Sequence, residues 1–213
     1  MELKELRQPK INPRTYLGDH EVQKIRTTSL GSENLVICRD LFLFMCNTGL
    51  AYSDLFGLRS DNISQKLGGK QIDGFRQKTK VEFLIPLSEE AETILDKYLN
   101  HPLAKKKNLL LPVLSNQVFN RHLKEISGTC GINKDLTTHV ARHTFATTAL
   151  TSGVPLETMQ KVLGHADQRM TLHYARIVNA KINKDMEAFK DHMKKQMHKP
   201  NPTTQSNQFL RVV

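Results

Sequence analysis

The chain has 213 residues, which fits one domain and is long enough to bury a hydrophobic core. Hydrophobic residues make up 38% and charged residues 24%, a composition that excludes wholesale disorder. Lysine and arginine number 31 against 21 acidic residues, so the formal net charge is +10. A basic domain of this size commonly binds nucleic acid, although charge alone is equally compatible with a merely solvated surface.

Neither membrane insertion nor secretion is expected. No apolar run approaches the ~18 residues that a membrane helix needs, and the first seven residues are too charged for a secretory signal. The three cysteines (Cys38, Cys46 and Cys130) are an odd number without the spacing of a metal site. They indicate reduced thiols in a cytoplasmic protein.

Helical spacing dominates the N-terminal part of the chain. Residues 1–18 are polar, contain two prolines and are expected to form an extended linker. Apolar periodicity then predicts helices that begin near Asp19 and near Glu33. The second of these ends at Gly49, because glycine readily adopts the left-handed conformation that closes a helix. A short helix is predicted over 52–58.

A small antiparallel sheet is predicted over residues 60–87. Val81, Phe83 and Ile85 alternate with other residues, as in a strand with one buried face, and Pro86 suits a sheet edge. Further helices are predicted over 88–100, 115–127, 138–152, 155–163, 168–177 and 180–197.

The predicted fold class is therefore mostly α with a small antiparallel β-sheet (α+β). One domain is expected over 19–198, followed by a polar tail over 199–213. The lysine run at 105–107 is expected in a solvated loop.

The segment 136–156 contains His139, Arg142 and His143 but no aspartate or glutamate. Its other residues are so apolar that the helix is expected to be buried, and a buried guanidinium is costly without an anion. Either a distant carboxylate reaches Arg142, or the anion is a ligand. His139 and Arg142 share one helix face, and together they suit a phosphate oxygen.

Two other interpretations of this segment stay open. His139 and His143 have the i, i+4 spacing of a zinc site, but the glutamate of the HExxH motif is missing and Arg142 would lie beside the metal, so no metal is expected. Alternatively, the histidines are core residues with satisfied hydrogen bonds.

Two tight turns, at 153–155 and at Gly164, are expected to fold the next helices back onto this segment. His165 directly follows the second turn, and Tyr174 lies on the next helix, which Asp167 can cap. These short connections favour a shared site over isolated core histidines.

With these residues in view, the chain resembles the tyrosine recombinase (lambda-type phage integrase) family over residues 19–190. The strongest matches are His139-Val-Ala-Arg142-His143-Thr-Phe-Ala-Thr, Leu163-Gly-His165, and Tyr174 nine residues after His165. Weaker matches are Thr48-Gly-Leu-Ala-Tyr-Ser-Asp54-Leu, similar to the family's first box, and Arg76-Gln-Lys78-Thr79, similar to its lysine-bearing hairpin. The first box is most similar to integrases of Bacteroides-group mobile elements.

The resemblance implies a role for each matched residue. Tyr174 would attack a DNA phosphate, forming a 3′-phosphotyrosyl link and freeing a 5′-hydroxyl. Arg142, His139 and His165 would stabilise the transition-state charge, and Lys78 would protonate the leaving oxygen. No cofactor is implied, since these groups supply the charge and no Gly-x-x-x-x-Gly-Lys loop is present. Two further residues would support the site: Asp54 and His143.

One position departs from the family. The first box carries an arginine where this chain has Ala51, and the loss of one such donor costs ~10²–10³ in rate. Arg59 and Arg76 are the candidates nearest in sequence to replace it, and Lys80 lies on the predicted hairpin. If no basic residue replaces it, two alternatives remain. The site is slow until DNA or a second protomer completes it, or the protein binds DNA without cutting it.

The predicted hairpin is strongly basic, with one acidic residue, Asp73, over 64–80. Its basic residues are Lys66, Lys70, Arg76, Lys78 and Lys80. A hairpin of this kind would follow the phosphate backbone of double-stranded DNA and bind it in a salt-dependent way. The alternative is an ordinary solvated hairpin.

The expected assembly is a homo-tetramer on DNA and a monomer without DNA. Ile182, Met186, Phe189 and Met193 form an apolar stripe on the last predicted helix, and the chain ends in the apolar segment Phe209–Val213. Family members dock a C-terminal segment on the neighbouring protomer. For an isolated monomer, packing of the stripe on its own domain is favoured.

The function expected from the sequence is site-specific cleavage and rejoining of DNA, which integrates or excises a mobile element. Family members carry an N-terminal DNA-clamping domain, so the chain is expected to be part of a longer, nucleoid-associated integrase. One alternative is a type IB topoisomerase, which relaxes supercoils without exchanging strands. The other is a catalytically silent DNA-binding regulator, which Ala51 makes conceivable.

Overall fold

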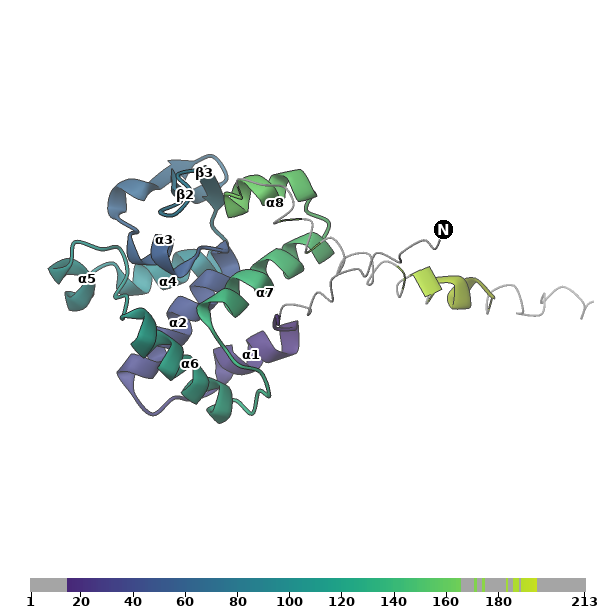
Figure 1. Ribbon diagram of the computed structural model, residues 1–213, viewed down its shortest axis with the longest axis horizontal. Helices are drawn as coiled ribbons and strands as arrows, with labels where there is room; N and C mark the ends of the chain where they lie inside the picture. Colours follow the sequence, from purple (N-terminus) through teal and green to yellow (C-terminus); the bar gives the residue numbers. More distant parts are fainter. Residues whose placement is uncertain are drawn as a thin grey trace, which may run out of the picture.

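The computed structural model describes residues 15–165, 171, 174, 183, 186, 187 and 189–194. The domain is a group of helices with a small sheet at one edge, next to α8 (Figure 1). The elements are α1 (Asp19–Thr27), α2 (Glu33–Thr48), α3 (Tyr52–Phe56), a 3-10 turn (Ser60–Asn62), β1 (Ile63–Lys66), β2 (Gly69–Phe75), β3 (Glu82–Pro86), α4 (Glu89–Tyr98), α5 (Pro102–Lys106), α6 (Asn116–Thr129), α7 (Thr138–Thr151) and α8 (Leu156–Leu163). This architecture confirms the predicted fold class.

Helix α2 is the central helix of the domain. Ten of its 16 residues are buried, because it is apolar on nearly every side and packs against α1, α4, α6 and α7. It begins at Ser32, whose side chain accepts a hydrogen bond from the Leu35 amide, and it ends at Gly49, where φ is +64°. The ring of Phe145 on α7 lies against Gly49 and leaves no room for a side chain there.

The three strands form one antiparallel sheet in the order β1-β2-β3. Ile72 is paired with Ile63 on one side and with Ile85 on the other, so the sheet turns an apolar face to the helices. Pro86 lies in the edge strand β3, as expected. Strand β3 also contacts α8, and this contact brings the β2–β3 turn close to the end of that helix.

Helix α7 links the helical core to α8. It begins at Thr137, whose hydroxyl accepts a hydrogen bond from the Val140 amide, and it lies along α2. Figure 1 shows α8 between the end of α7 and the sheet, in agreement with its contacts to both. The turn at 153–155 therefore folds α8 back onto α7, as predicted.

Two local predictions are wrong. The lysine run at 105–107 is not simply a loop, because Pro102 and the capping side chain of His101 start the one-turn helix α5. The short helix α3 ends at Phe56 rather than at 58. All three cysteines are unpaired, as expected. No helix in the described part of the chain is long and apolar enough to cross a membrane.

The C-terminal stripe does not pack on its own domain at the positions that the structure describes. Met186, Phe189 and Met193 are 47%, 54% and 45% exposed, and their helix lies apart from the body of the domain in Figure 1. The expectation for an isolated monomer is therefore wrong for these three residues. Other predictions fall wholly or mostly on residues outside the described part. They are the linker over 1–18 (except 15–18), the Asp167 cap, most of the helices over 168–177 and 180–197, Ile182 and Phe209–Val213.

Candidate active site

One pocket brings together most of the residues singled out from the sequence. It has a volume of about 690 Å³ and lies where α3, the β2–β3 turn, α7 and the end of α8 meet. Its lining residues are Ala51, Tyr52, Ser53, Asp54, Arg76, Lys78, Thr79, Asn116, Thr138, His139, Arg142, His143, Gly164, His165 and Tyr174. The pocket thus contains every residue to which the family resemblance gives a role, together with Ala51.

Arg142 is held by backbone carbonyls. It donates to the Gly49 carbonyl at 2.6 Å and to the Leu163 carbonyl at 2.7 Å, at the C-terminal ends of α2 and α8. Helix C-termini carry partial negative charge, so they stabilise the guanidinium without neutralising it. The sequence did not reveal these two carbonyl bonds, and the alternative that a ligand supplies the anion stays a prediction. Burial lowers the pKa of Arg142 to about 10, helped by the charge of Arg76, which leaves Arg142 protonated at neutral pH.

Arg76 and Asp54 form a buried ion pair beside Arg142. Arg76 is 4% exposed and donates to Asp54 Oδ2 at 2.8 Å and to the Val162 carbonyl at 2.7 Å. The other Asp54 oxygen accepts a hydrogen bond from the backbone N–H of Gln77 at 2.9 Å. Asp54 therefore fixes the start of the β2–β3 turn. Burial lowers the pKa of Arg76, although its bond to Asp54 opposes this shift.

Gly164 completes the support of Arg76. Its φ is +57°, and a Cβ at this position would lie 2.6 Å from Arg76 Nε and 2.7 Å from its Cγ. The guanidinium carbon of Arg76 also lies 4.1 Å from the centre of the Phe83 ring. The Leu-Gly-His motif therefore requires glycine both for the turn and for the close approach of an arginine.

The two proposed substitutes for the missing arginine are in different places. Arg76 lines the pocket together with Ala51, which precedes α3. Arg59 is not among the lining residues, and it donates to the Asn108 carbonyl at 2.7 Å. Lys78 lines the pocket from the exposed β2–β3 turn.

Tyr174 contacts His143 directly. The tyrosine hydroxyl and His143 Nδ1 are hydrogen-bonded at 2.6 Å, and the two ring centres are 5.6 Å apart. Tyr174 is 1% exposed and packs with apolar residues of α7 and α8, including Leu150 and Met159. His143 was assigned only a supporting position from the sequence, because no local pattern reveals a contact between residues 31 positions apart.

The other two histidines occupy different depths of the pocket. His165 is buried, and its Nδ1 is hydrogen-bonded to Thr171 Oγ1 at 2.8 Å. His139 is exposed on the first turn of α7, three residues before Arg142. No group of three or more His, Cys, Asp or Glu side chains arranged to hold a metal occurs among the described residues.

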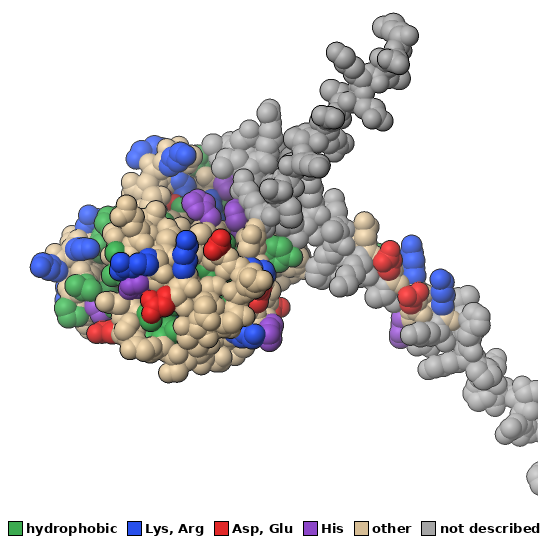
Figure 2. Space-filling model, turned by 60° about the horizontal axis from the view of Figure 1, so that its bottom comes forward, with side chains coloured by type: hydrophobic (Ala, Val, Ile, Leu, Met, Phe, Trp, Pro, Cys, Tyr) green, Lys and Arg blue, Asp and Glu red, His purple; other side chains and the backbone are tan. Residues whose placement is uncertain are grey.

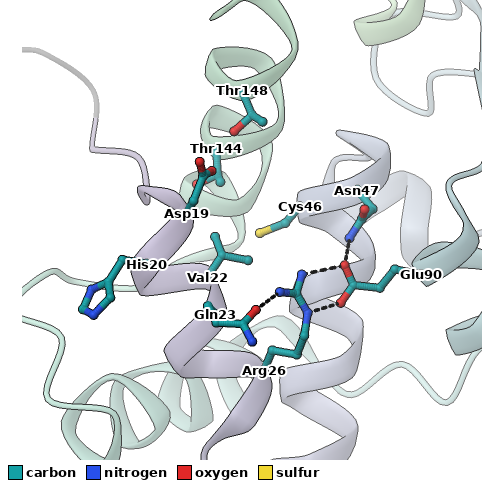
Figure 3. Close-up of a pocket in the computed structure, with 10 residues that line it drawn as sticks. All are labelled: Asp19, His20, Val22, Gln23, Arg26, Cys46, Asn47, Glu90, Thr144 and Thr148. Atoms are coloured by element: carbon teal, nitrogen blue, oxygen red, sulfur yellow. Dashed lines mark hydrogen bonds and ion pairs between the residues drawn. The ribbon is translucent and has the colours of Figure 1, made fainter. Parts of the chain in front are cut away.

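A second pocket offers a useful contrast. It has a volume of about 560 Å³ and lies between α1, α2, α4 and α7 (Figure 3). Its arginine, Arg26, forms two bonds to Glu90, at 2.7 and 2.8 Å, and Asn47 donates to the same carboxylate at 2.9 Å. The charge of Arg26 is thus compensated by a carboxylate, whereas Arg142 is bound by neutral carbonyls. The pocket around Arg142 is the better site for a phosphate.

Three of the lysines predicted to bind DNA, Lys66, Lys70 and Lys80, are not among the lining residues of the site. Lys66 is exposed on β1, Lys80 is exposed with φ +58°, and Lys70 on β2 donates to Asp96 of α4 at 2.8 Å. Asp96 raises the pKa of Lys70 and compensates part of its charge. Figure 2 shows Lys and Arg side chains at several places on one face of the domain, with Asp and Glu between them.

Comparisons with known proteins define the class. Residues 15–181 match the phage integrase family, so the chain belongs to this family. Among its relatives, the tyrosine recombinase XerD of Lacticaseibacillus casei is 34% identical over 151 residues, which cover 66% of this chain and 50% of that protein. XerD of Oceanobacillus iheyensis is 30% identical over 181 residues, which cover 80% and 60%. The chain thus spans about half the length of the curated relatives it matches.

Solved structures show the same fold. XerA recombinase has a TM-score of 0.64 at 22% identity, over 85% of this chain and 66% of that one. A post-cleavage complex of the XerH recombinase with its difH substrate has a TM-score of 0.67 at 19% identity, over 84% and 54%. The catalytic domain of bacteriophage HP1 integrase has a TM-score of 0.55 at 19% identity, over 91% and 99%. The family resemblance inferred from the sequence is confirmed; the similarity to Bacteroides-group integrases stays a prediction.

Proposed function

We propose that the chain is the catalytic part of a site-specific DNA recombinase, which integrates or excises a mobile element through a 3′-phosphotyrosyl intermediate. The observation that carries this proposal is the convergence of the Tyr174 phenol with Arg142, His139, His165 and Lys78 on one pocket. The names of the XerD relatives support the activity, and the XerH complex supports DNA as the substrate. The expected setting is the cytoplasm, at the nucleoid.

The proposed reaction needs one nucleophile and several cations. The Tyr174 oxygen attacks the scissile phosphorus, a new O–P bond forms, and the bond to the 5′-oxygen breaks. Arg142, His139 and His165 stabilise the negative charge that gathers on the non-bridging oxygens. Lys78 gives a proton to the leaving 5′-oxygen. Attack by the 5′-hydroxyl of a second strand on the phosphotyrosyl link then reverses these steps.

Arg76 is proposed to replace the arginine that is missing at Ala51. It lines the pocket, and its charge lowers the pKa of Arg142, as expected of two cations that share a site. Its terminal nitrogens each carry one more N–H than the bonds to Asp54 and Val162 use. A phosphate in the pocket would therefore meet two guanidinium groups, as in the family's usual site.

The proposed assembly is a homo-tetramer on DNA, formed through the C-terminal segment, with a monomer in its absence. The exposed stripe of Met186, Phe189 and Met193 supports this proposal, because an uncovered apolar helix face is suited to a protein partner. Lys66, Lys70 and Lys80 are proposed to contact the phosphate backbone beside the scissile position.

Duplexes with a nick next to a randomised sequence test the proposed activity, because a cleaved product strand dissociates and traps the enzyme on DNA. We expect a denaturant-resistant protein–DNA adduct that Tyr174→Phe abolishes, and transfer of the bound strand to a second duplex. No adduct from a chain that binds DNA would indicate a silent regulator. If the chain forms the adduct and relaxes supercoiled DNA but transfers no strand to a second duplex, it would be a topoisomerase.

A further inference from the structure

The contact between Tyr174 and His143 points to a function for His143 beyond support. The phenol oxygen that would attack the phosphate is the atom bonded to His143 Nδ1, at 2.6 Å. His143 directly follows Arg142 on α7, so the backbone that fixes the guanidinium also fixes the imidazole. An imidazole nitrogen at this distance from a hydroxyl is in position to receive its proton.

We propose that His143 is the general base of the reaction, an inference that rests on the proposed function. As the Tyr174 oxygen bonds to phosphorus, its proton moves to Nδ1 of His143, and the 5′-oxygen leaves with a proton from Lys78. When a 5′-hydroxyl attacks the phosphotyrosyl link, its proton goes to Lys78 and the Tyr174 oxygen recovers its proton from His143. The cycle therefore returns both groups to their starting state.

Burial of the phenol explains why a protein base is needed. An ordinary phenol has a pKa of about 10, so only about one molecule in a thousand is ionised at neutral pH. Tyr174 is 1% exposed, so bulk water is poorly placed to take its proton. Arg142 favours the phenolate electrostatically, but a guanidinium cannot accept a proton.

The other groups that face the pocket are less suited to this step. Arg76 and Lys78, from the β2–β3 turn, are cations, and Asp54 on α3 is bonded to Arg76 and to the Gln77 amide. On α7, His139 is exposed at the pocket surface. After α8, the Nδ1 of His165 is bonded to Thr171.

The charge balance of the pocket favours proton transfer from Tyr174 to His143 when a phosphate is bound, and opposes it when the pocket is empty. Before DNA binds, the charges of Arg76, Lys78 and Arg142 oppose a further positive charge on His143. A bound phosphate offsets these cations, so an imidazolium next to a developing phosphotyrosyl bond becomes acceptable. Proton transfer would then be coupled to substrate binding.

The pH dependence of single-turnover cleavage tests this role on nicked duplexes that the wild-type chain cuts. His143→Gln retains a polar side chain but cannot hold the proton. We expect its rate to be about 10²-fold lower at pH 7 and to rise about tenfold per pH unit up to pH 9, as the phenol ionises without a base. The wild-type rate is expected to level off above about pH 7, as is typical of a neutral imidazole.

A substrate with sulfur in place of the scissile 5′-oxygen separates the base from the acid, because a thiolate leaves without a proton. It is expected to restore cleavage by Lys78→Ala but not by His143→Gln. Free imidazole is expected to restore cleavage by His143→Ala, a result that a purely structural role would not produce. His20→Gln, at an exposed position on α1 beside the other pocket, is the matched control and is expected to cleave at the wild-type rate.

Two results would overturn the role of His143. One is a His143→Gln pH profile parallel to that of the wild type, and the other is restoration of that variant by the sulfur substrate. Thermal unfolding of each variant shows whether its loss of rate is only a loss of fold, and rescue by imidazole requires a folded chain. If the wild-type chain forms no Tyr174-dependent adduct, the proposed function fails together with this role.

Discussion

Arg142 shows how a single residue can be half-buried, charged and available to a ligand. Its two hydrogen bonds go to carbonyl oxygens, so its full positive charge remains for an incoming anion. Arg76 beside it has a carboxylate partner, Asp54, and is more deeply buried. The two arginines are therefore expected to contribute differently: Arg142 as the main phosphate ligand, and Arg76 as a second donor held rigidly in place.

Replacement of Arg76 tests whether it compensates for Ala51. Arg76→Lys keeps a positive charge, but its single compact ammonium cannot reproduce the separate positions of the two guanidinium nitrogens that bind Asp54 and the Val162 carbonyl. We expect the rate of adduct formation to fall ~10²–10³-fold, the usual cost of one lost transition-state donor. Arg59→Lys, outside the pocket, is expected to change the rate less than about twofold. Equal effects of the two substitutions would contradict the assignment.

Much of the site chemistry could be predicted from residue types, but its contacts could not. Tyr174, Arg142 and the histidines were identified because they lie in short, ordered motifs. The bonds of Arg142 to Gly49 and of Tyr174 to His143 span 93 and 31 positions, and only the packing of α7 against its neighbours creates them.

At the scale of elements, the turn after α8 ties the sheet to the helices. Gly164 ends α8 in the left-handed region and lies against the side chain of Arg76. The helix boundaries themselves were largely predictable, because Ser32 and Thr137 cap their helices locally and Gly49 and Gly164 end theirs. Helix α5 was missed because a lysine run suggested solvent and hid the starting signal of His101 and Pro102.

Comparison of Gly164→Ala with Gly131→Ala separates the effect of backbone strain from damage to the site. The left-handed conformation costs a residue with a side chain roughly 1–2 kcal/mol, and the new methyl group would also displace Arg76. Gly131 has a similar φ, +61°, and a methyl group there would meet nothing within 4 Å, so Gly131→Ala carries the strain alone. Urea unfolding is expected to show a loss of about 1–2 kcal/mol for Gly131→Ala and at least as much for Gly164→Ala. Only Gly164→Ala should also slow adduct formation, and normal cleavage by this variant would contradict a role for Gly164 in the site.

At the scale of the whole molecule, the net charge of +10 predicts salt-dependent DNA binding. Each lysine that contacts a phosphate contributes about one unit to the slope of log K against log salt. Lys66→Gln and Lys80→Gln are each expected to lower that slope by about one, as measured by fluorescence anisotropy. Lys106→Gln, on α5, is the control and should leave the slope unchanged. A flat affinity between low and moderate salt would exclude backbone binding.

The exposed stripe allows the proposed tetramer on DNA to be tested. Replacing Met186, Phe189 and Met193 with serine removes its apolar surface, and these side chains lie on no buried face of the domain. Sedimentation with a nicked duplex is expected to show a tetramer for the wild-type chain and smaller complexes for the triple variant. Thermal unfolding of the free chain should be unchanged. A tetramer of normal stability from the variant would assign the interface elsewhere.

The attachment of Arg142 to the ends of α2 and α8 makes the pocket depend on the integrity of the whole domain. Neither carbonyl belongs to the helix that carries the arginine, so loosening of either end releases the guanidinium. On the proposed function, a partly unfolded chain is expected to lose phosphate binding, and cleavage with it. In the proposed recombinase, this dependence would keep partly folded copies from cutting DNA.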